Sequence, residues 1–270
     1  MIVEVDGARI AYEDVGEGRP VVFLHAFPLN RTMWASQTAA LAGDWRCLTI
    51  DVRGFGESSA TAPFSVDRYA DDVAAVLDHA GIGHAILVGL SMGGYIAFAF
   101  WRRHAERMRA LVLADTRAGA DTADTLQRRR ELIAVARAEG AAAVAERQVV
   151  GLLGRSTRER RPDLVVDTQR IAEQASVPGI IGGLEAMMAR PDSTPTLRTL
   201  TVPTLIVVGN EDVLTPPKEA RAMQAGIARS RLEVLGEAGH LSNVEQPLAF
   251  NTALQQFLRT IEGEPWGVSL

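Results

Sequence analysis

The sequence predicts an α/β fold, with a mostly parallel sheet of eight strands and helices on both faces. Continuous apolar runs recur along the chain, which is typical of strands that helices cover on both sides. Amphipathic stretches, each long enough for a crossover helix, separate these runs. The alternation stops between about residues 116 and 200, where Ala-, Arg- and Glu-rich segments have helical spacing. We therefore expect an α/β core with a helical insertion.

The predicted strands begin with a hairpin. Two alternating segments flank Asp6-Gly7-Ala8, and Asp-Gly between strand-like segments favours a tight antiparallel turn. Most later strands are continuous apolar runs, and the full set is 2–5, 9–12, 21–25, 47–51, 85–89, 110–114, 204–209 and 232–235. The crossover helices that we expect are 66–79, 92–104, 218–227 and 247–261.

The helical stretch divides the chain into a core and a cap. Residues 1–116 and 200–270 form the expected core, and residues 117–199 form a cap inserted after the sixth strand. Arg128-Arg129-Arg130 in the cap precedes Glu131 and shares its helix with apolar residues, which favours a solvated helix face over an anion-binding patch. The tail 262–270, which contains Trp266, is the segment expected to be disordered, and its role is unexplained.

Composition and charge limit the class of partner. The chain has 47% hydrophobic and 23% charged residues, as expected for a globular protein with a buried core. Its formal net charge of -5 argues against a nucleic-acid partner or an anionic membrane, since both require clustered Lys and Arg. No apolar run has the length of a membrane span and no leader precedes the first strand, so we expect a cytoplasmic protein. We also expect a monomer or a homodimer. A neutral or mildly polar small molecule fits this balance best.

A serine lies at a tight turn between a predicted strand and a predicted helix. Gly89-Leu90-Ser91-Met92-Gly93 has the pattern G-x-S-x-G, directly after the strand 85–89. Side chains larger than hydrogen at positions 89 and 93 would collide with the strand and the helix. In this context the pattern favours a nucleophilic Ser91 over a structural pair of glycines.

A serine hydroxyl needs a histidine to accept its proton and a carboxylate to orient that histidine. His240 is the favoured general base and acid, because it lies between the last strand and the last helix, where strand ends face a ligand crevice. Two aspartates, Asp115 and Asp212, follow strands between the serine and the histidine. We prefer Asp212, because Pro216-Pro217 would start a helix and fix its loop. Asp115 is the alternative, and its other possible role is to cap the first turn of the cap domain.

Backbone N–H groups are expected to stabilise the oxyanion of the reaction. Met92 supplies one, and Phe27 supplies the other from the loop after the third strand, which Pro28 stiffens. An apolar acyl pocket is expected beside these loops. Its candidate residues, besides Phe27 and Met92, are Trp34, Leu152, Leu153, Met187 and Met188.

Two further segments are expected to brace the site. His25 ends the third strand and is expected to brace the loop that follows it. Gly54 and Gly56 lack the third glycine of a dinucleotide-binding loop, so their segment is not expected to bind a dinucleotide. Asp51 and Arg53 in this segment are instead expected to brace the floor of the site. His, Cys and carboxylate residues form no cluster with metal-ligand spacing, so we expect neither a metal nor a cofactor.

Together these motifs resemble the cap-bearing α/β-hydrolase superfamily over nearly the whole chain, and most of all the 3-oxoadipate enol-lactonase-like esterases. The segments that carry the resemblance are 25–29 (HAFPL), 51–58 (DVRGFGES), 89–94 (GLSMGG), 209–216 (GNEDVLTP) and 238–247 (AGHLSNVEQP). Ala26 replaces the glycine of most relatives, which would narrow the oxyanion loop.

The resemblance implies roles for five residues. They are Ser91 as nucleophile, His240 as base, Asp212 as acid, and Met92 and Phe27 as oxyanion donors. It implies cleavage of small carboxylic esters or lactones through an acyl-enzyme.

Three other functions remain alternatives for the same residues. The superfamily includes hydrolases of carbon–carbon bonds and perhydrolases, which also use serine, and non-catalytic ligand receptors. Epoxide hydrolases and haloalkane dehalogenases are excluded, because they have an aspartate where this chain has Ser91.

Overall fold

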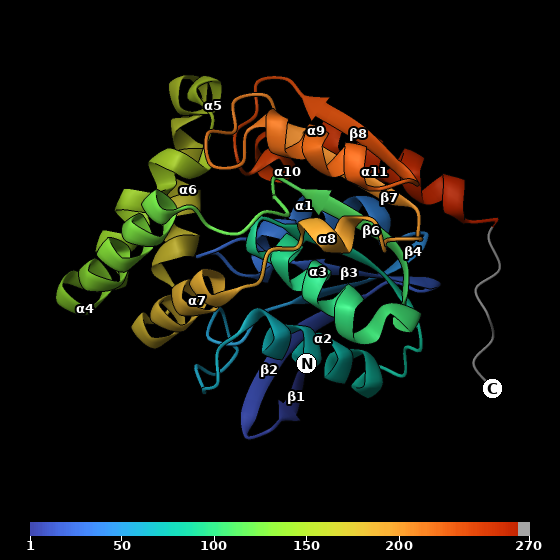
Figure 1. The fold of residues 1–270 in the computed structure, drawn as a ribbon, viewed down its shortest axis with the longest axis horizontal. Helices are drawn as coiled ribbons and strands as arrows, with labels where there is room; N and C mark the ends of the chain where they lie inside the picture. The colour runs from blue at the N-terminus through green and yellow to red at the C-terminus, as the bar shows by residue number, and fades with distance from the viewer. Residues whose placement is uncertain (264–270) are drawn as a thin grey trace.

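The computed structural model describes residues 1–263, and its centre is an eight-stranded sheet in the order β1-β2-β4-β3-β5-β6-β7-β8 (Figure 1). Strand β2 is antiparallel to β1 and β4, whereas all pairs from β4 to β8 are parallel. This confirms the predicted sheet. The strands are β1 (Ile2–Val5), β2 (Ala8–Val15), β3 (Arg19–Leu24), β4 (Trp45–Ile50), β5 (Ala85–Leu90), β6 (Met108–Ala114), β7 (Thr204–Gly209) and β8 (Ser230–Leu235).

The sheet has an apolar core on each face. Every residue of β5 and β7 is buried, and neighbouring residues alternate between the two cores, as the period of a strand requires. In β5, Leu87 belongs to one core, whereas Ile86 and Val88 belong to the other. The continuous apolar runs of the sequence therefore reflect two buried faces.

Helices cover both faces. Side chains of α2 (Val66–His79), α3 (Met92–His104) and α9 (Pro217–Gly226) contribute to one core, and those of α1 (Ala35–Leu41) and α11 (Pro247–Ile261) to the other. The predicted bounds of α2, α3 and α11 are confirmed, whereas α1 was not predicted. Two short 3₁₀ helices, η1 (Arg31–Trp34) and η2 (Ala105–Arg107), complete these connections. No helix within residues 1–263 is both long enough and apolar enough to span a membrane.

Five helices lie between β6 and β7. They are α4 (Ala123–Leu152), α5 (Arg155–Arg160), α6 (Pro162–Glu173), α7 (Val177–Ala189) and α8 (Thr194–Leu197). Helix α4 packs against α6 and α7, and these helices lie together at one side of the sheet (Figure 1), whereas α8 contacts α9 of the core. Gly140, with a φ of 86°, breaks α4 into two helical segments. The predictions for Trp266 and most of the tail lie outside the described residues.

A buried carboxylate joins the cap to the core. One oxygen of Glu245, in the short helix α10 (Ser242–Glu245), accepts from the N–H of Gly154 in the cap at 2.8 Å. The other accepts from the N–H groups of Gly239 at 2.8 Å and Leu241 at 3.2 Å. Glu245 therefore fixes a cap turn against the loop that contains His240.

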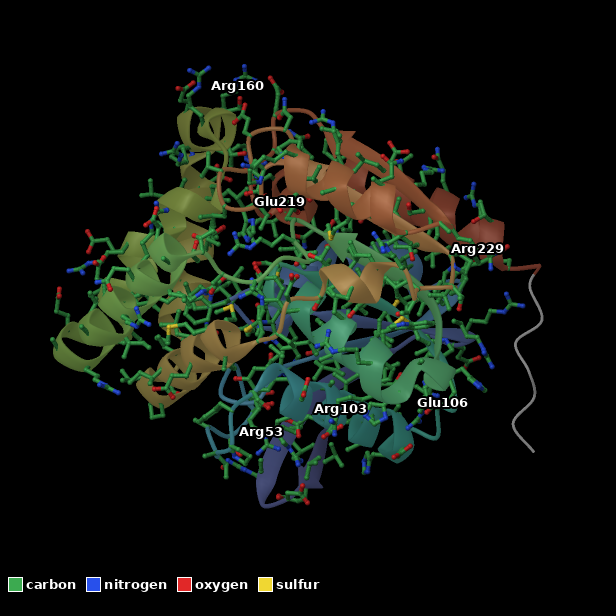
Figure 2. The ribbon with its side chains drawn as sticks, in the orientation of Figure 1. Arg53, Arg103, Glu106, Arg160, Glu219 and Arg229 are labelled. Atoms are coloured by element: carbon green, nitrogen blue, oxygen red, sulfur yellow. The ribbon has the colours of Figure 1, made fainter. Side chains whose placement is uncertain are left out.

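The loop after β4 is braced by buried charges. Charged side chains such as Arg160, at the end of α5, project from the surface (Figure 2), whereas Arg53 is fully buried. Arg53 donates to both carboxylate oxygens of Asp72 at 2.7 and 2.6 Å. Asp51 accepts from the N–H groups of Arg31 at 2.8 Å and Glu57 at 2.9 Å. These contacts hold the loop after β4, whereas the role predicted for Asp51 and Arg53 at the floor of the site stays a prediction.

Candidate active site

Ser91 lies on a strained turn between β5 and α3. Its φ of 55° and ψ of -109° are unusual for a residue with a side chain. A Cβ on Gly89 would overlap the carbonyl of Gly93, and one on Gly93 would overlap the carbonyl of Leu24 in β3. Thr116 holds the turn by donating to the Ser91 carbonyl at 2.8 Å. The glycines of the G-x-S-x-G pattern are therefore required for packing.

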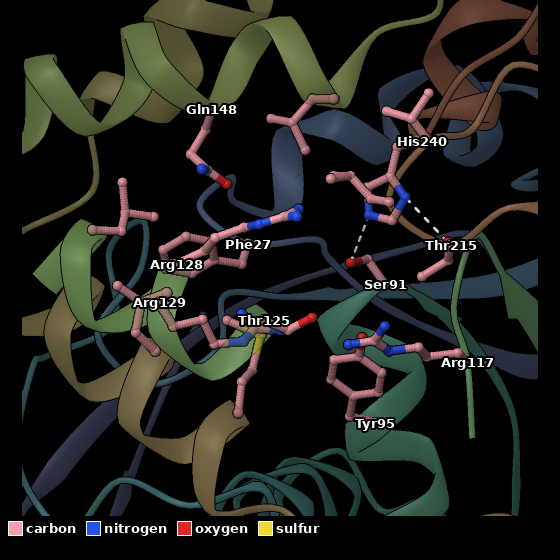
Figure 3. Close-up of a pocket in the computed structure, with 16 residues that line it drawn as sticks. Phe27, Ser91, Tyr95, Arg117, Thr125, Arg128, Arg129, Gln148, Thr215 and His240 are labelled. Atoms are coloured by element: carbon pink, nitrogen blue, oxygen red, sulfur yellow. Dashed lines mark hydrogen bonds between the residues drawn. The ribbon is translucent and has the colours of Figure 1, made fainter. Parts of the chain in front are cut away.

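Ser91, His240 and Asp212 form a hydrogen-bonded line, and Figure 3 shows its contact between His240 and Ser91. His240 Nε2 lies 2.7 Å from Ser91 Oγ, and His240 Nδ1 lies 2.8 Å from Asp212 Oδ2. A carboxylate accepts a hydrogen bond from the Nδ1–H group, so the proton of a neutral imidazole stays on Nδ1. Nε2 is then free to accept a hydrogen bond from the serine hydroxyl. Asp212 is held by the N–H groups of Leu214 at 2.8 Å and Thr215 at 2.9 Å, and by the Thr215 hydroxyl at 2.6 Å.

The surroundings of Asp212 favour its charged form. Burial alone would raise its pKa, but the charge of His240 and the hydrogen bonds from His240 and Thr215 lower the pKa below its ordinary value. Asp212 is therefore ionised at neutral pH, in the state that orients an imidazole.

Asp115 lies nearby but has different partners. It is fully buried, and its Oδ1 accepts from the N–H of Gly209 at 2.8 Å. Its Oδ2 accepts from the hydroxyl of Ser242, two residues after His240. The carboxylate that His240 contacts is therefore that of Asp212 and not that of Asp115.

Burial raises the pKa of Asp115 well above its ordinary value, and the neighbouring charge of Asp212 raises it further. The suggestion that Asp115 caps the cap domain is wrong, because Thr122 is the N-cap of α4.

The two expected oxyanion donors belong to the start of α3 and to the loop after β3. Met92 is the first residue of α3, where N–H groups lack an acceptor within the helix. Within residues 1–263, neither the Met92 N–H nor the Phe27 N–H donates to a protein acceptor. The Phe27 loop is held by His25, whose Nε2 accepts from the Val52 N–H at 3.0 Å and whose Nδ1 donates to the Ala26 carbonyl at 2.9 Å.

A cavity of about 190 Å³ lies over Ser91 and His240, between the core loops and the cap. Phe27 lines it (Figure 3), as do Leu152 and Met187, and all three are among the pocket residues that the sequence proposes. Its lining is Phe27, Ser91, Tyr95, Arg117, Thr125, Arg128, Arg129, Leu132, Gln148, Leu152, Leu184, Met187, Val213, Leu214, Thr215 and His240.

Four predicted pocket residues, Trp34, Met92, Leu153 and Met188, do not line this cavity, and Met92 is fully buried in the core. Trp34 is fully buried in the core, with its ring 5.2 Å from that of Phe23 and 6.1 Å from that of Phe250. Leu153 is buried in the same core, and Met188 packs against the core on the other face. The pocket prediction for these four is wrong, because their side chains complete the packing of core and cap.

Arginines also line the cavity, beside the apolar residues. Arg117, Arg128 and Arg129 line the cavity, although Arg128 is exposed, as is Arg130. The prediction of a solvated face therefore fits Arg128 and Arg130, whereas Arg129 is half-buried and pairs with Asp121. Residues three and four apart share a helix face. The sequence therefore already indicated that Thr125, Arg128, Arg129 and Leu132 lie on one face of the helix. The direction of that face depends on how α4 packs.

A family model described as alpha/beta hydrolase fold matches residues 19–247, and the chain belongs to this family. It is 31% identical over 240 residues to 3-oxoadipate enol-lactonase 2 of Acinetobacter baylyi, with 88% of each chain covered. It is 31% identical over 273 residues to 2-hydroxymuconate semialdehyde hydrolase of Pseudomonas sp. (strain CF600), which covers 93% of this chain and 91% of that protein. The structure of a thermophilic esterase from Thermogutta terrifontis superposes with a TM-score of 0.92 at 38% identity, over 96% of this chain and 97% of that one.

Proposed function

We propose that this chain is a serine hydrolase that cleaves small carboxylic esters or lactones through an acyl-enzyme. The observation that carries the proposal is the hydrogen-bonded line from Asp212 through His240 to Ser91, which ends inside a cavity. The similarity to an enol-lactonase and an esterase supports the same reaction class.

The first half of the reaction forms the acyl-enzyme. Ser91 Oγ attacks the carbonyl carbon while its proton passes to His240 Nε2, and Asp212 stabilises the imidazolium. The oxyanion accepts hydrogen bonds from the N–H groups of Phe27 and Met92. His240 then gives its proton to the leaving oxygen, the carbon–oxygen bond breaks, and the acyl group stays on Ser91.

The second half releases the acid. A water molecule gives a proton to His240 and attacks the acyl carbon, and the proton returns to Ser91 Oγ when the acyl bond breaks. In a lactone the leaving oxygen remains part of the acyl chain, so water releases a single hydroxy acid or its keto form.

Hydrolysis of a carbon–carbon bond is the second candidate, because the similarity to 2-hydroxymuconate semialdehyde hydrolase extends over nearly the whole chain. It uses the same serine and histidine but requires a vinylogous diketone as substrate. Comparing such a diketone with esters and lactones of similar size separates the two candidates.

The test is a hydrolysis panel on purified protein. It contains 4-nitrophenyl esters of graded chain length, an enol-lactone, an acyl-homoserine lactone and a vinylogous diketone. We expect ester or lactone turnover, with Ser91→Ala reducing kcat by about ten-thousand-fold or more. The control is Ser36→Ala on the exposed start of α1, which should retain full activity. Turnover that Ser91→Ala does not diminish would overturn the proposal.

A further inference from the structure

Strand β8 is an outer edge of the sheet (Figure 1). It is the last strand in the sheet order, and β7 is its only strand neighbour within residues 1–263. The carbonyl of Arg229, directly before β8, accepts from the N–H of Thr204 at 2.9 Å. The carbonyl of Leu235, at the other end of β8, accepts from the N–H of Asn210 at 2.8 Å. The odd-numbered residues of this strand therefore direct their backbone groups toward β7.

The even-numbered residues of β8 direct their backbone groups outward. Successive residues of a strand point their N–H and C=O groups to alternate sides, so those of Ser230, Leu232 and Val234 point away from β7. No loop or side chain within residues 1–263 forms a hydrogen bond with these backbone groups. A row of such groups at the edge of a sheet is ready to pair with a further strand.

Two opposite charges make β8 complementary to a reversed copy of itself. Arg231 and Glu233 lie on one face of the strand, one on each side of Leu232, and their side chains are 41% and 37% exposed. If two copies of β8 pair antiparallel about Leu232, Arg231 of each copy lies opposite Glu233 of the other. Because the outward backbone groups belong to even-numbered residues, these opposite charges form the pairs without backbone hydrogen bonds, where side chains are closest.

The same register uses every outward backbone group of the strand. Leu232 lies opposite Leu232 of the other copy, and Ser230 lies opposite Val234. Each of these pairs exchanges two hydrogen bonds between N–H and C=O groups. Registers shifted along the strand leave some of these groups unpaired and separate the opposite charges. Backbone and side chains therefore favour the same alignment.

Exposed apolar side chains flank this edge. Val234 is 42% exposed, and Leu248, at the start of α11, is 83% exposed. A groove of about 350 Å³ lies between β8 and α11, and Leu235, Leu248 and Ala249 are among the residues that line it. A second copy paired along β8 would cover part of this surface, and burial of apolar area favours association.

We propose that two copies of this chain associate through β8, with the two strands antiparallel and Leu232 on the twofold axis. The sheet then continues from one copy into the other, and each copy contributes the same surface. No residue of β8 lines the catalytic cavity, so this inference does not depend on the proposed function.

Sedimentation velocity on the full chain tests the charges. We expect a dimer at about 100 μM, a concentration well above the Kd of a micromolar complex. Arg231→Glu and Glu233→Arg should each raise the dimer Kd by at least about tenfold, because each places like charges opposite one another at two symmetric positions. Mixing the two variants in equal amounts should restore dimers, since opposite charges then face each other again. The control is Arg158→Glu on the exposed surface of α5, which should leave the Kd unchanged.

Cysteine cross-linking tests the register. Residues directly opposite in a hydrogen-bonded pair have Cα atoms about 5.5 Å apart, within the range of a disulfide. We expect Leu232→Cys to form a covalent dimer under mild oxidation with diamide. The matched control is Val234→Cys, which lies opposite Ser230 of the other copy and should stay uncross-linked. The native Cys47 is buried and should not react.

The outcomes decide the proposal. A wild-type chain that stays monomeric at about 100 μM would overturn it, because even a micromolar complex would be dimeric there. A dimer that neither charge variant weakens, or a mixture of the two that stays monomeric, would show that these charges do not face each other. Cross-linking of Val234→Cys as fast as Leu232→Cys would contradict the register. Circular dichroism verifies the fold of each variant, and Leu232→Cys decides where a charge variant unfolds.

Discussion

Two buried aspartates, Asp115 and Asp212, follow the neighbouring strands β6 and β7 but favour different protonation states. Asp212 receives hydrogen bonds from His240 and Thr215, which together with the charge of His240 outweigh the effect of burial on its pKa. Asp115 has a serine hydroxyl and a backbone N–H as partners, and burial raises its pKa well above the ordinary value. Part of the rise in the pKa of Asp115 comes from the charge of Asp212, since two nearby carboxylates repel each other.

Substituting each aspartate by its amide tests this difference directly. We expect Asp212→Asn to reduce kcat by about ten-thousand-fold, because an amide favours the wrong histidine tautomer. Asp115→Asn should retain kcat within about tenfold, because its amide can accept from Gly209 and donate to Ser242. Steady-state kinetics on one ester measures both, and the opposite ranking would assign the acid to Asp115.

The raised pKa of Asp115 also predicts how stability depends on pH. In the unfolded chain Asp115 loses its proton near its ordinary value of 3.8, whereas in the folded protein it retains the proton to higher pH. The contribution of Asp115 to the free energy of unfolding is therefore fully present below about pH 3.8. It decreases by about 1.4 kcal/mol per pH unit as the pH rises from there toward the pKa of Asp115 in the folded protein.

Urea unfolding of wild type and Asp115→Asn at several pH values between about pH 4 and pH 7 measures this effect. We expect the variant to gain stability relative to the wild type as pH rises. A difference that is constant across this range would show that Asp115 does not titrate abnormally.

The sequence identified Ser91 and His240 because local patterns mark them, a strand-turn-helix motif and a loop before the last helix. It could not decide firmly between Asp115 and Asp212, because both follow strands and only the folded geometry shows which carboxylate meets His240. Trp34 was misassigned for a related reason. An aromatic residue near a loop can face a cavity or the core, and packing on Phe23 and Phe250 decides for the core.

At the scale of elements, the turn between β5 and α3 depends on a close approach to β3. A Cβ on Gly93 would overlap the backbone carbonyl of Leu24, which cannot rotate away as a flexible side chain can. We expect Gly93→Ala to lower the free energy of unfolding by about 2 kcal/mol or more. Gly43→Ala is the control, because a Cβ at Gly43 would meet nothing within 4 Å.

Denaturant midpoints of the two variants, measured beside wild type, check this prediction. Equal midpoints for Gly93→Ala and wild type would contradict the packing requirement at this turn.

The type of an element was predictable where apolar residues recur at a regular spacing over a long stretch of sequence. Helices α2 and α11 have one apolar face each, and their bounds match the prediction. Helix α1 has only seven residues, too few for a clear helical pattern. In α4, the face of Arg129 could not be predicted, because the same spacing fits solvent or a cavity until the packing against α6 and α7 is known.

At the scale of the whole molecule, the cap and the core share the site, and Glu245 joins them. We expect Glu245→Gln to lower the free energy of unfolding by about 1–3 kcal/mol, because an amide cannot accept from three N–H groups as a carboxylate does. It should also lower kcat, because Gly239 and Leu241 flank His240.

Chemical denaturation and ester kinetics on Glu245→Gln measure both effects, with Glu185→Gln on the exposed face of α7 as the control. Loss of stability with unchanged kcat would show that the Glu245 contacts hold the cap but do not position the histidine. The interrupted strand-helix alternation of the sequence predicted the helices between β6 and β7. It could not reveal this link, because Gly154 and Glu245 are distant in the chain.

The most direct test of the catalytic assignment is covalent labelling with diethyl 4-nitrophenyl phosphate. Its diethylphosphoryl group is transferred to an activated serine, and the phosphorylated serine is not readily hydrolysed. We expect release of one equivalent of 4-nitrophenol and one diethylphosphoryl group on the peptide that contains Ser91, with parallel loss of ester hydrolysis. Ser91→Ala should remain unlabelled. Labelling at another residue, or hydrolysis that persists after complete labelling of Ser91, would contradict Ser91 as the nucleophile.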